Sequence, residues 1–350
     1  MHPKKILHVA NLSLTVKGAG YYGVPFKISN GLTRCGHHVL PFSDRDIARA
    51  ATIFRSRKWG IRPANDQLVA VAKEFRPDII LFGHADSIRP ETLVRLRDAL
   101  PAVRLAQWNV DPLFEPDNVR RLNSKIDHVD ATFVSTAGTQ LDALSASGRH
   151  AVAFLPNPVD PSIERARCFA VPRRDLASDL FFAVGSGPFP RNHCGQETCG
   201  NEIAERLMAA LPHLRGDFPG CLGAPLKVGA PYEAALASSA MGLNISRRND
   251  TTWYSSDRMA HLVGSGQLTF IDRAAGFDAL FDDSELGFYS TEDELVAKLD
   301  HFLADDDARK RVAEAGWAAY RRLFDTTRIA AYMVDVILGD LDPQQHRWTR

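Results

Sequence analysis

The sequence predicts an α/β fold made of two doubly wound domains, and three observations support this prediction. Short apolar segments rich in β-branched residues alternate with amphipathic helical patterns along most of the 350 residues. The alternation is interrupted once, by a proline-rich stretch near residue 160, and then starts again. Near-continuous apolar strands separated by helices are typical of parallel sheets covered on both faces. We therefore expect one domain over residues 1–158 and a second over 159–324.

The first domain is expected to begin with a strand in KKILHVA. Five more strand patterns follow in HHVLPF, PDIILFG, VRLAQWNV, DATFVS and HAVAFLP. Between them, apolar residues at helical spacing predict helices over Val24–Arg34, Asn65–Phe75, Pro90–Leu100 and Thr136–Ser147.

The second domain is expected to start after PNPVDPSIERARCFAVPRRD. The predicted order is a strand in DLFFAVGS, a helix from Gln196 to Leu211, a strand in MGLNIS, a helix from Ser256, a strand in LTFID and two helices from Glu292 to Leu323. A last helix within 325–342 either packs back on the first domain or forms a dimer contact, and the sequence leaves both open. Because ligands of open α/β sheets bind at the carboxyl ends of the strands, we expect the two domains to face a cleft.

Composition excludes several classes of function. Lys plus Arg and Asp plus Glu each number 42, and a chain without a positive excess is a poor candidate for general nucleic-acid binding. The five cysteines are scattered and do not indicate a disulfide framework, while His193, Cys194 and Cys199 lack a second pair at a zinc spacing, so no metal is expected. The chain shows neither a signal peptide nor an apolar run of membrane-spanning length. We expect a cytoplasmic protein with at most peripheral membrane contact.

A glycine-rich loop precedes the first predicted helix. Its residues Gly18, Gly20, Tyr21, Tyr22 and Gly23 lie in GAGYYG, formally a dinucleotide-binding GxGxxG, with Asp44 where a ribose-binding acid would follow. That fingerprint needs its first glycine at the end of the strand, and NLSLTVK intervenes here. A NAD(P)-dependent oxidoreductase is therefore the alternative, and we expect the backbone N–H groups of this loop to contact an acceptor substrate.

The stretch LNISRRNDTTWYSSDRMAHLVGSGQ runs from an apolar strand into arginines and hydroxyls, and then into a helix. Ser255 or Ser256 suits the N-cap, Asp257 complements the helix dipole, and His261 lies one turn later on the polar face beside Arg258. A solvated helix face would give the same pattern. Because arginines gather at a helix start, we expect a phosphate site. The expected ligands from this stretch are Arg247, Arg248, Ser255, Ser256, Asp257, Arg258 and His261.

A second glycine-rich turn follows the strand in DLFFAVGS. Gly185 and Ser186 let the backbone approach a phosphate, and Arg191 can neutralise one with a two-pronged hydrogen bond. A flexible turn without a ligand is the other interpretation. We place these three residues in the same expected phosphate site.

Three polar residues follow strands of the first domain. His84 and Asp86 lie in FGHADS and Asp111 lies in WNVDP, where each is placed to act as a general base. Asp is equally favoured at turns and N-caps. Asp86 is the favoured base because a carboxylate needs no particular tautomer.

Several segments resemble the GT-B glycosyltransferases, specifically the group related to the spore maturation protein CgeB and the glycosyl transferase group 1 domain. They are GLTRCGHHVLPF, RPDIILF, WNVDP, FLPNPVDP and the stretch from SSDRMAHLVGSGQ to ARKRVAEAGW. The resemblance implies two Rossmann-like domains, with a nucleotide-sugar donor on the second and an acceptor on the first. Arg258 and Gly266 fall on the family's arginine and glycine. His261 and Trp253 stand where the family has glutamates.

The expected function is therefore metal-independent transfer of a sugar from a nucleotide-diphosphate donor, with no further cofactor. The acceptor is a glycan, a lipid-linked molecule or a protein, and the oligomeric state is left open. Arg191, Arg258 and the N–H groups of Ser255–Asp257 would stabilise the charge of the leaving diphosphate. A non-catalytic nucleotide-sugar-binding protein is a further alternative, because both family glutamates are missing.

Overall fold

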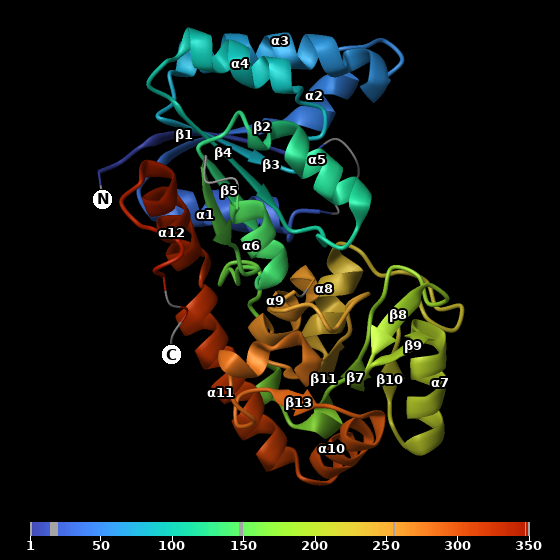
Figure 1. Cartoon of the computed structure of the whole chain (residues 1–350). Coiled ribbons are helices and arrows are strands. Elements are labelled where there is room, and N and C mark those ends of the chain that lie inside the picture. The colour runs from blue at the N-terminus through green and yellow to red at the C-terminus, as the bar shows by residue number, and fades with distance from the viewer. Residues whose placement is uncertain (1, 15–19, 147–149, 255, 347, 349–350) are drawn as a thin grey trace. The chain divides into compact units, whose positions relative to one another are not determined.

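The computed structural model describes residues 2–14, 20–146, 150–254, 256–346 and 348. Their contacts divide the chain into two compact units, coloured along the sequence in Figure 1. Unit 1 comprises Met1–Pro158 and Thr326–Arg347, and unit 2 comprises Val159–Asp325 and Trp348–Arg350. The predicted α/β class is confirmed, since each unit is built on a parallel sheet with helices around it.

Unit 1 contains a six-stranded parallel sheet of order β2-β1-β3-β4-β5-β6. The strands are β1 Lys5–Ala10, β2 His38–Ser43, β3 Ile79–Gly83, β4 Arg104–Asn109, β5 Ala131–Val134 and β6 Ala151–Phe154. Five of them lie within segments predicted as strands, and β2 ends at Ser43, one residue beyond the predicted HHVLPF. The inner strands β3 and β5 are buried along their whole length, which explains their continuous apolar sequences.

The helices of unit 1 lie on both sides of this sheet, with α2, α3 and α4 on one side and α1 and α12 on the other (Figure 1). Their bounds are α1 Val24–Arg34, α2 Asp44–Ala50, α3 Arg57–Phe75, α4 Pro90–Ala99, α5 Pro116–Ile126, α6 Thr139–Ser145 and α12 Thr326–Leu338.

The prediction for α1 is confirmed to the residue, whereas α2 and α5 were not predicted. Helix α2 has only seven residues, too few for a helical period to stand out. Helix α3 starts at Arg57 rather than Asn65, because its exposed first turns carry no apolar stripe facing a core. Helix α6 starts at Thr139 rather than Thr136, and the predicted end at Ser147 lies outside the described residues.

Helix α12 packs on α1, although almost 300 residues separate them in sequence. A Cβ atom on Gly31 would lie 2.3 Å from the carbonyl oxygen of Thr326, so glycine permits this close crossing. The Cys35 Sγ also donates to the Thr327 carbonyl at 3.3 Å. Of the two placements that the sequence left open, the structure shows the one within unit 1.

Unit 2 contains a five-stranded parallel sheet of order β10-β7-β11-β12-β13 and a two-stranded antiparallel hairpin, β8-β9. The strands are β7 Ser178–Phe181, β8 Pro190–His193, β9 Gln196–Cys199, β10 Gly216–Asp217, β11 Ser239–Asn244, β12 Leu268–Asp272 and β13 Gly287–Tyr289. The helices are α7 Gly200–Ala210, α8 Ala230–Ala237, α9 Asp257–Gly264, α10 Glu292–Ala304 and α11 Asp306–Phe324, with 3-10 turns at Cys168–Ala170, Arg173–Asp175, Arg273–Ala275 and Phe277–Ala279.

The predicted helix over Gln196–Leu211 is wrong in its first turn. Gln196–Cys199 is the second strand of the hairpin, and α7 begins at Gly200. A capping box fixes this start, since the Glu202 side chain accepts from the backbone N–H of Cys199 while Cys199 caps the helix. The polar sequence of the hairpin gave no strand pattern to predict.

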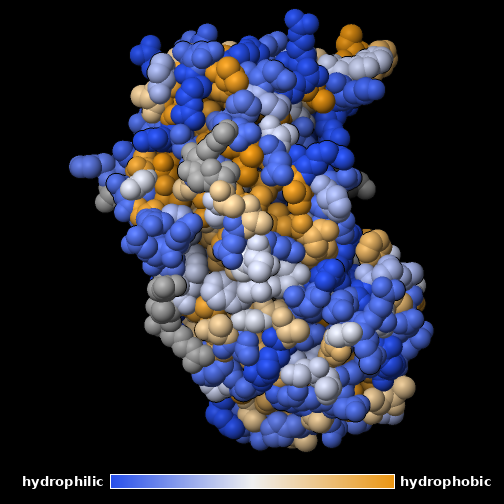
Figure 2. Space-filling model, viewed as in Figure 1, coloured by the Kyte–Doolittle hydropathy of each residue, from blue (hydrophilic) through white to orange (hydrophobic). Residues whose placement is uncertain are grey.

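Large apolar side chains are exposed at the corner where α2 runs into α3, as the space-filling view shows at one edge of unit 1 (Figure 2). Most other large apolar residues are buried, and each unit has a large apolar core. In unit 1 the core lies between the sheet and helices α3 and α4, and in unit 2 it lies between the sheet and helices α7, α10 and α11. Among the described residues, no helix is both long enough and apolar enough to cross a membrane.

Candidate functional site

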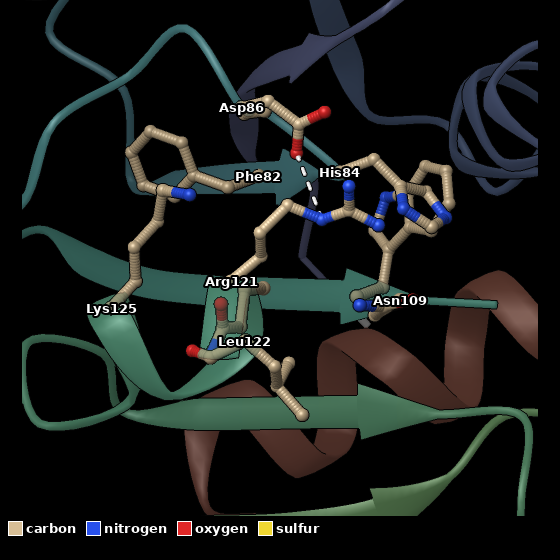
Figure 3. A pocket seen from close by; sticks show the side chains of 10 residues that line it. Phe82, His84, Asp86, Asn109, Arg121, Leu122 and Lys125 are labelled. Atoms are coloured by element: carbon tan, nitrogen blue, oxygen red, sulfur yellow. Dashed lines mark hydrogen bonds and ion pairs between the residues drawn. The ribbon is translucent and has the colours of Figure 1, made fainter. Parts of the chain in front are cut away.

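Of the three polar residues predicted after β3 and β4 of unit 1, His84 and Asp86 line one pocket (Figure 3), and Asp111 lies beside it, in contact with His84. The pocket encloses about 280 Å³, including space open to solvent. It is lined by Phe82, His84, Ala85, Asp86, Gln107, Trp108, Asn109, Arg121, Leu122 and Lys125. Neighbouring parallel strands end at the same edge of a sheet, which is why residues 20 or more apart in sequence converge here.

His84 is held in one orientation. Its Nε2 accepts a hydrogen bond from the Val110 backbone N–H at 3.2 Å, and its Nδ1 lies 3.4 Å from Asp111 Oδ2. The ring packs edge-on against Trp108 at 5.2 Å. Burial lowers the pKa of His84, although Asp111 and Asp86 act in the other direction. The neutral ring therefore has its proton on Nδ1, facing Asp111, and Nε2 is occupied, so the geometry favours Asp111 and Asp86 over His84 as a base.

Two arginines contact Asp86, which lines this pocket, and Asp111, which lies beside it. Arg45 donates to Asp86 Oδ2 at 2.5 Å, and Arg121 lies 3.2 Å from Asp111 Oδ2 and 4.0 Å from Asp86 Oδ1. The exposed fraction is 24% for the Asp86 side chain and 43% for that of Asp111, so both reach solvent. Burial also lowers the pKa of Lys125 beside them. The pocket thus offers the Asp86 carboxylate to a hydroxyl group and two cations, Arg121 and Lys125, to an anionic substituent.

The glycine-rich loop before α1 is described only from Gly20, and Gly18 lies outside the described residues. Gly23 is the N-cap of α1 and donates to the Gly20 carbonyl at 3.0 Å. The rings of Tyr21 and Tyr22 meet edge-on at 5.5 Å. Tyr21 is 39% exposed, so part of its side chain reaches solvent.

Asp44 does not stand where a ribose-binding acid would stand. It begins α2, is fully buried and accepts the Ser87 backbone N–H at 3.1 Å. Burial raises the pKa of its carboxyl group. Because this side chain supports the loop after β3 instead of facing a ligand, the geometry disfavours the dinucleotide alternative.

The strongest electrostatic feature of unit 2 is a pair of arginines, Arg191 and Arg258, called here the arginine pair. Both donate to the carbonyl oxygen of Ile245, Arg191 at 3.4 Å and Arg258 at 2.9 Å. Arg191 is only 6% exposed, and Arg258 is partly buried. Burial, together with repulsion from Arg258, lowers the pKa of Arg191 to about 10, and burial lowers the pKa of Arg258 as well.

Neither member of the arginine pair has an ion-pair partner in the part of the chain that the structure describes. Burying a positive charge is costly unless an anion or several hydrogen bonds compensate it. Two such charges sharing one carbonyl oxygen increase that cost. The arrangement is suited to a bound anion with at least two oxygens.

The hairpin and the strand ends place the arginine pair. Residues alternate between the two sides of β8, so Arg191 and His193 point to the buried side. The Asn192 backbone N–H donates to the Arg247 carbonyl at 2.8 Å, which joins the hairpin to the loop after β11. Asn249 stabilises this loop by accepting the Ser246 N–H at 2.9 Å. The carboxyl end of β11 is therefore where the two arginines meet.

Further polar atoms without hydrogen bonds lie close to the arginine pair in sequence. Ser256 is the N-cap of α9, yet its side chain makes no capping bond, in contrast with the predicted cap. The buried atoms that lack a partner among the described residues include Arg191 Nε, Asn244 Oδ1, Ser246 Oγ and Ser256 Oγ. Buried polar atoms are nearly always satisfied, so this group indicates a polar ligand.

The other residues expected to bind the donor are less directly placed. Arg247 is exposed and stacks on the Phe189 ring at 4.2 Å, while Arg248 forms an exposed two-pronged ion pair with Asp250. Gly185 and Ser186 are exposed after β7. Ser255 lies outside the described residues. The structure thus brings Arg191 and Arg258 together, whereas the side chains of Arg247 and Arg248 are exposed to solvent.

His261 is occupied on both ring nitrogens. Its Nδ1 lies 2.7 Å from Glu164 Oε1, and its Nε2 lies 3.1 Å from Asp257 Oδ2. The ring is buried and meets Tyr232 edge-on at 5.6 Å. Direct hydrogen bonding of His261 to the ribose or a phosphate of the donor is therefore not the role that this geometry favours. His261 instead orients Asp257 at the start of α9.

Sequence reasoning missed Glu164, which precedes α9 by about 90 residues and lies in the proline-rich stretch. Gly264 permits its approach, because a Cβ atom there would lie 2.8 Å from Glu164 Cγ. The chain therefore supplies a buried carboxylate beside His261 from a distant segment. The segment PSIER has no sequence feature that indicates this contact.

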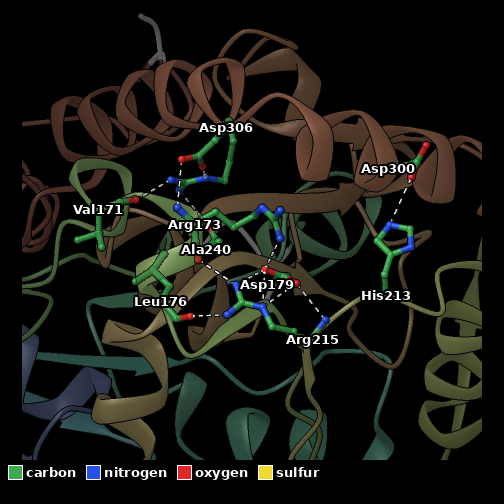
Figure 4. Close-up of polar contacts among 10 residues, drawn as sticks. Val171, Arg173, Leu176, Asp179, His213, Arg215, Ala240, Asp300 and Asp306 are labelled. Carbon is green, nitrogen blue, oxygen red and sulfur yellow. Dashed lines mark hydrogen bonds and ion pairs between the residues drawn. The ribbon is translucent and has the colours of Figure 1, made fainter.

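In a second charged cluster of unit 2 the arginines, unlike the arginine pair, are paired with a carboxylate of the protein (Figure 4). Asp179, near the start of β7, is fully buried and accepts from Arg173 at 2.9 Å and from the Arg215 backbone N–H at 3.0 Å. Burial alone would raise the pKa of Asp179, but hydrogen bonds from Arg215 and Arg173 outweigh it and hold the pKa below its usual value. Here the arginines are satisfied by the protein itself, so this cluster is structural.

Within the described residues, no group of three His, Cys, Asp or Glu side chains is placed to hold a metal ion. Cys194 lies in the turn between β8 and β9, Cys199 is the last residue of β9, and none of the five cysteines forms a disulfide. His193 donates to or accepts from Tyr289 at 3.0 Å.

Comparison with known proteins agrees with this fold. Residues 207–335 match the family described as glycosyl transferase-like. No curated protein sequence matches the chain significantly. Sucrose-phosphate synthase from Thermosynechococcus elongatus is similar in structure at 10% identity, with a TM-score of 0.61 over 96% of this chain and 98% of that chain.

Two further solved structures are similar over nearly their whole lengths. The Anabaena protein HepE in complex with UDP-glucose has 13% identity and a TM-score of 0.60, over 97% of this chain and 100% of that chain. A UDP-forming trehalose-phosphate synthase from Burkholderia xenovorans has 12% identity and a TM-score of 0.58, over 96% of this chain and 99% of that chain. The chain therefore has the GT-B fold of these glycosyltransferases, with two Rossmann-like units, and carries a glycosyl transferase-like segment in residues 207–335.

Proposed function

We propose that this protein transfers a sugar from a nucleotide-diphosphate donor to an acceptor, with the donor diphosphate bound by the arginine pair of unit 2. The observation that carries the proposal is that Arg191 and Arg258 share the Ile245 carbonyl and have no carboxylate partner among the described residues. Of the similar structures, HepE was solved with UDP-glucose, which supports a nucleotide-sugar donor.

The arginine pair would stabilise the charge that develops on the diphosphate as the sugar leaves. Ser256 Oγ and Ser246 Oγ are buried and have no hydrogen-bond partner among the described residues, so they would donate to phosphate or ribose oxygens. The first N–H groups of α9 carry no side-chain cap and would add to this stabilisation. Since these groups supply the positive charge, we propose transfer without a metal ion, which activity retained in EDTA would support.

The acceptor would bind to unit 1, in the pocket of Figure 3. Asp86 or Asp111 would accept the proton of the attacking hydroxyl if the reaction inverts the configuration at the sugar. His84 would orient Asp111 through its Nδ1. A glycan, a lipid-linked molecule and a protein each offer such a hydroxyl group. Asp86 or Asp111 would accept its proton in each case.

Thermal-shift measurements with UDP, GDP, ADP, TDP, CMP and NAD test the donor site, because a ligand of the folded state raises its stability. We expect a response to at least one nucleoside diphosphate and none to NAD. Arg191→Met and Arg258→Met should each weaken the affinity about tenfold to a hundredfold, the usual value of a hydrogen bond to a charged group. Arg174→Met is the matched control, since that side chain is 86% exposed.

A panel of nucleotide sugars then separates transfer from binding alone. Turnover with any of them would exclude a non-catalytic binding protein. Saturable NAD binding without a response to any nucleoside diphosphate would overturn the proposal. Wild-type turnover in Arg258→Ala would remove the arginine pair from the mechanism, because losing a donor to a developing oxyanion costs about 3 kcal/mol of barrier.

A further inference from the structure

The connection between α2 and α3 exposes three large apolar side chains. Ile53 is 96% exposed, Phe54 78% and Trp59 66%, and the space-filling view shows apolar surface at this edge of unit 1 (Figure 2). Single exposed apolar residues are common on proteins, whereas a group of three large ones marks an interaction site. Residues 53–62 are called here the α2–α3 corner.

The shape of the α2–α3 corner is fixed by local contacts. The Arg55 N–H donates to the Thr52 carbonyl at 3.0 Å, and the Ser56 N–H donates to Thr52 Oγ1 at 2.8 Å. A Cβ atom on Gly60 would lie 1.6 Å from the Ala48 carbonyl oxygen, so glycine lets α3 cross α2 closely. The Phe54 and Trp59 rings meet edge-on at 6.2 Å. The apolar side chains are therefore held outward by an ordered turn.

Basic residues surround these apolar side chains. Arg55, Arg57, Lys58 and Arg62 are all exposed, and the sequence has no acidic residue between Asp46 and Asp66. In the part of the chain that the structure describes, none of the four forms an ion pair. The whole chain has a formal charge of zero, so this concentration of positive charge is local.

We propose that the α2–α3 corner docks the protein on an anionic lipid surface. Aromatic side chains such as Trp and Phe favour the boundary between head groups and acyl chains. Lys and Arg beside them are attracted to anionic head groups, each contributing about fivefold in affinity near the surface. The positive rim distinguishes this partner from an apolar protein groove, and the projecting apolar side chains distinguish it from a nucleic acid.

Sedimentation with lipid vesicles tests the proposal without any nucleotide, so the outcome is independent of the proposed function. The full chain should bind vesicles of phosphatidylcholine mixed with phosphatidylglycerol and bind pure phosphatidylcholine at least tenfold more weakly. Added salt should weaken the binding because it screens exposed charges. Equal binding to both vesicle types, or no binding to either, would overturn the proposal.

Two variants separate the apolar and the charged contributions. Ile53→Ser with Phe54→Ser should reduce binding to anionic vesicles at least tenfold, and so should Arg57→Gln with Lys58→Gln. Leu226→Ser with Val228→Ser is the matched control, because these residues are 56% and 55% exposed in unit 2 and should leave binding unchanged. All these positions are exposed, so the melting temperatures should stay close to wild type. If the variant with Ile53→Ser and Phe54→Ser still binds the vesicles, and an RNA oligonucleotide displaces it from them, the α2–α3 corner binds polyanions in general and the proposal is wrong.

Discussion

Arg191 and Arg309 are both buried arginines of unit 2, yet their surroundings differ in a way that predicts opposite effects on stability. Arg309 is fully buried, forms an ion pair with Asp306 at 2.6 Å and donates to the Val171 carbonyl at 2.8 Å. Arg191 has one long hydrogen bond, and its Nε has no partner among the described residues. A buried charge that is paired supports the fold, whereas one that awaits a ligand destabilises the ligand-free protein.

Arg191→Met should therefore raise the free energy of unfolding of the ligand-free protein, by about 1 to 2 kcal/mol, because an uncompensated charge is replaced by an apolar side chain. Arg309→Met should lower the free energy of unfolding by about 3 kcal/mol, because Asp306 and several carbonyl groups would lose their partner. Urea denaturation followed by circular dichroism measures both. Destabilisation by Arg191→Met of the same size as by Arg309→Met would show that Arg191 is a structural residue.

His8 predicts a dependence of stability on pH. It is fully buried, accepts from Trp108 Nε1 at 3.2 Å through Nε2 and shares a 2.7 Å hydrogen bond with Ser29 through Nδ1, which fixes it as the neutral tautomer. Burial lowers the pKa of His8 from 6.5 to about 4. The unfolded chain therefore binds more protons between these two values, and stability falls as the pH drops through this window.

The expected contribution of His8 to this loss is about 3 kcal/mol between pH 6.5 and 4. His8→Gln keeps an acceptor for Trp108 and a donor for Ser29 but does not titrate, so its stability should vary less with pH. His213→Gln is the matched control, because that ring is 66% exposed. A profile for His8→Gln as steep as that of wild type would mean that His8 is not the responsible group.

Residues that act through long-range contacts could not be predicted from the sequence. Arg258 and Arg191 were identified because each follows a strand end or opens a helix, which is local information. Glu164 was missed because its partner His261 is almost 100 residues away. The family glutamate at the position of His261 drew attention to a missing carboxylate, and the structure shows that one reaches this ring from elsewhere in the chain.

At the scale of helices and strands, the spacing of apolar residues decided which elements could be predicted. Helix α1 and strand β12 were predicted to the residue because their apolar positions are regular and clear breaks bound them. The β8-β9 hairpin was missed because PRNH and QETC are polar and short. Its place is set instead by contacts with the loop after β11, which only tertiary structure reveals.

Helix α9 depends on one glycine for its place in unit 2. A Cβ atom on Gly264 would lie 2.6 Å from Val159 Cγ2 and 2.8 Å from Glu164 Cγ. Gly264→Ala should therefore cost about 1 to 3 kcal/mol of stability, the usual effect of overpacking, and move Glu164 away from His261. Thermal unfolding of Gly264→Ala beside Gly185→Ala measures this, since Gly185 has no atom near its Cβ position. Equal melting temperatures for the two variants would contradict the close packing.

At the scale of the whole molecule, the α/β class and the two repeats of strand and helix were predictable, because each half carries its own alternation. The placement of α12 was not, since an amphipathic helix at the end of a chain suits several partners. The structure assigns it to unit 1, so the chain enters unit 2 after Pro158 and returns at Thr326. The last helix in the sequence is thus needed to complete the first unit.

This connectivity predicts that a core substitution on α12 weakens the first unit. Met333 is fully buried, and α12 contacts α1, β4 and β6. Met333→Ala should cost about 2 to 5 kcal/mol, the usual loss on truncating a buried side chain. Hydrogen exchange followed by mass spectrometry should show faster exchange in α1, β4 and β6 than in wild type, with β11 and β12 unchanged.

Leu299→Ala on α10 is the matched control, because Leu299 is equally buried but belongs to the core of unit 2. It should accelerate exchange in β11 and β12 and leave α1 unchanged. Gly31→Ala should repeat the pattern of Met333→Ala, since its Cβ would separate α1 from the Thr326 carbonyl. Faster hydrogen exchange in both units of every variant would mean that the two units unfold as one cooperative body. The assignment of α12 to unit 1 would then have no effect on the stability of unit 1 alone.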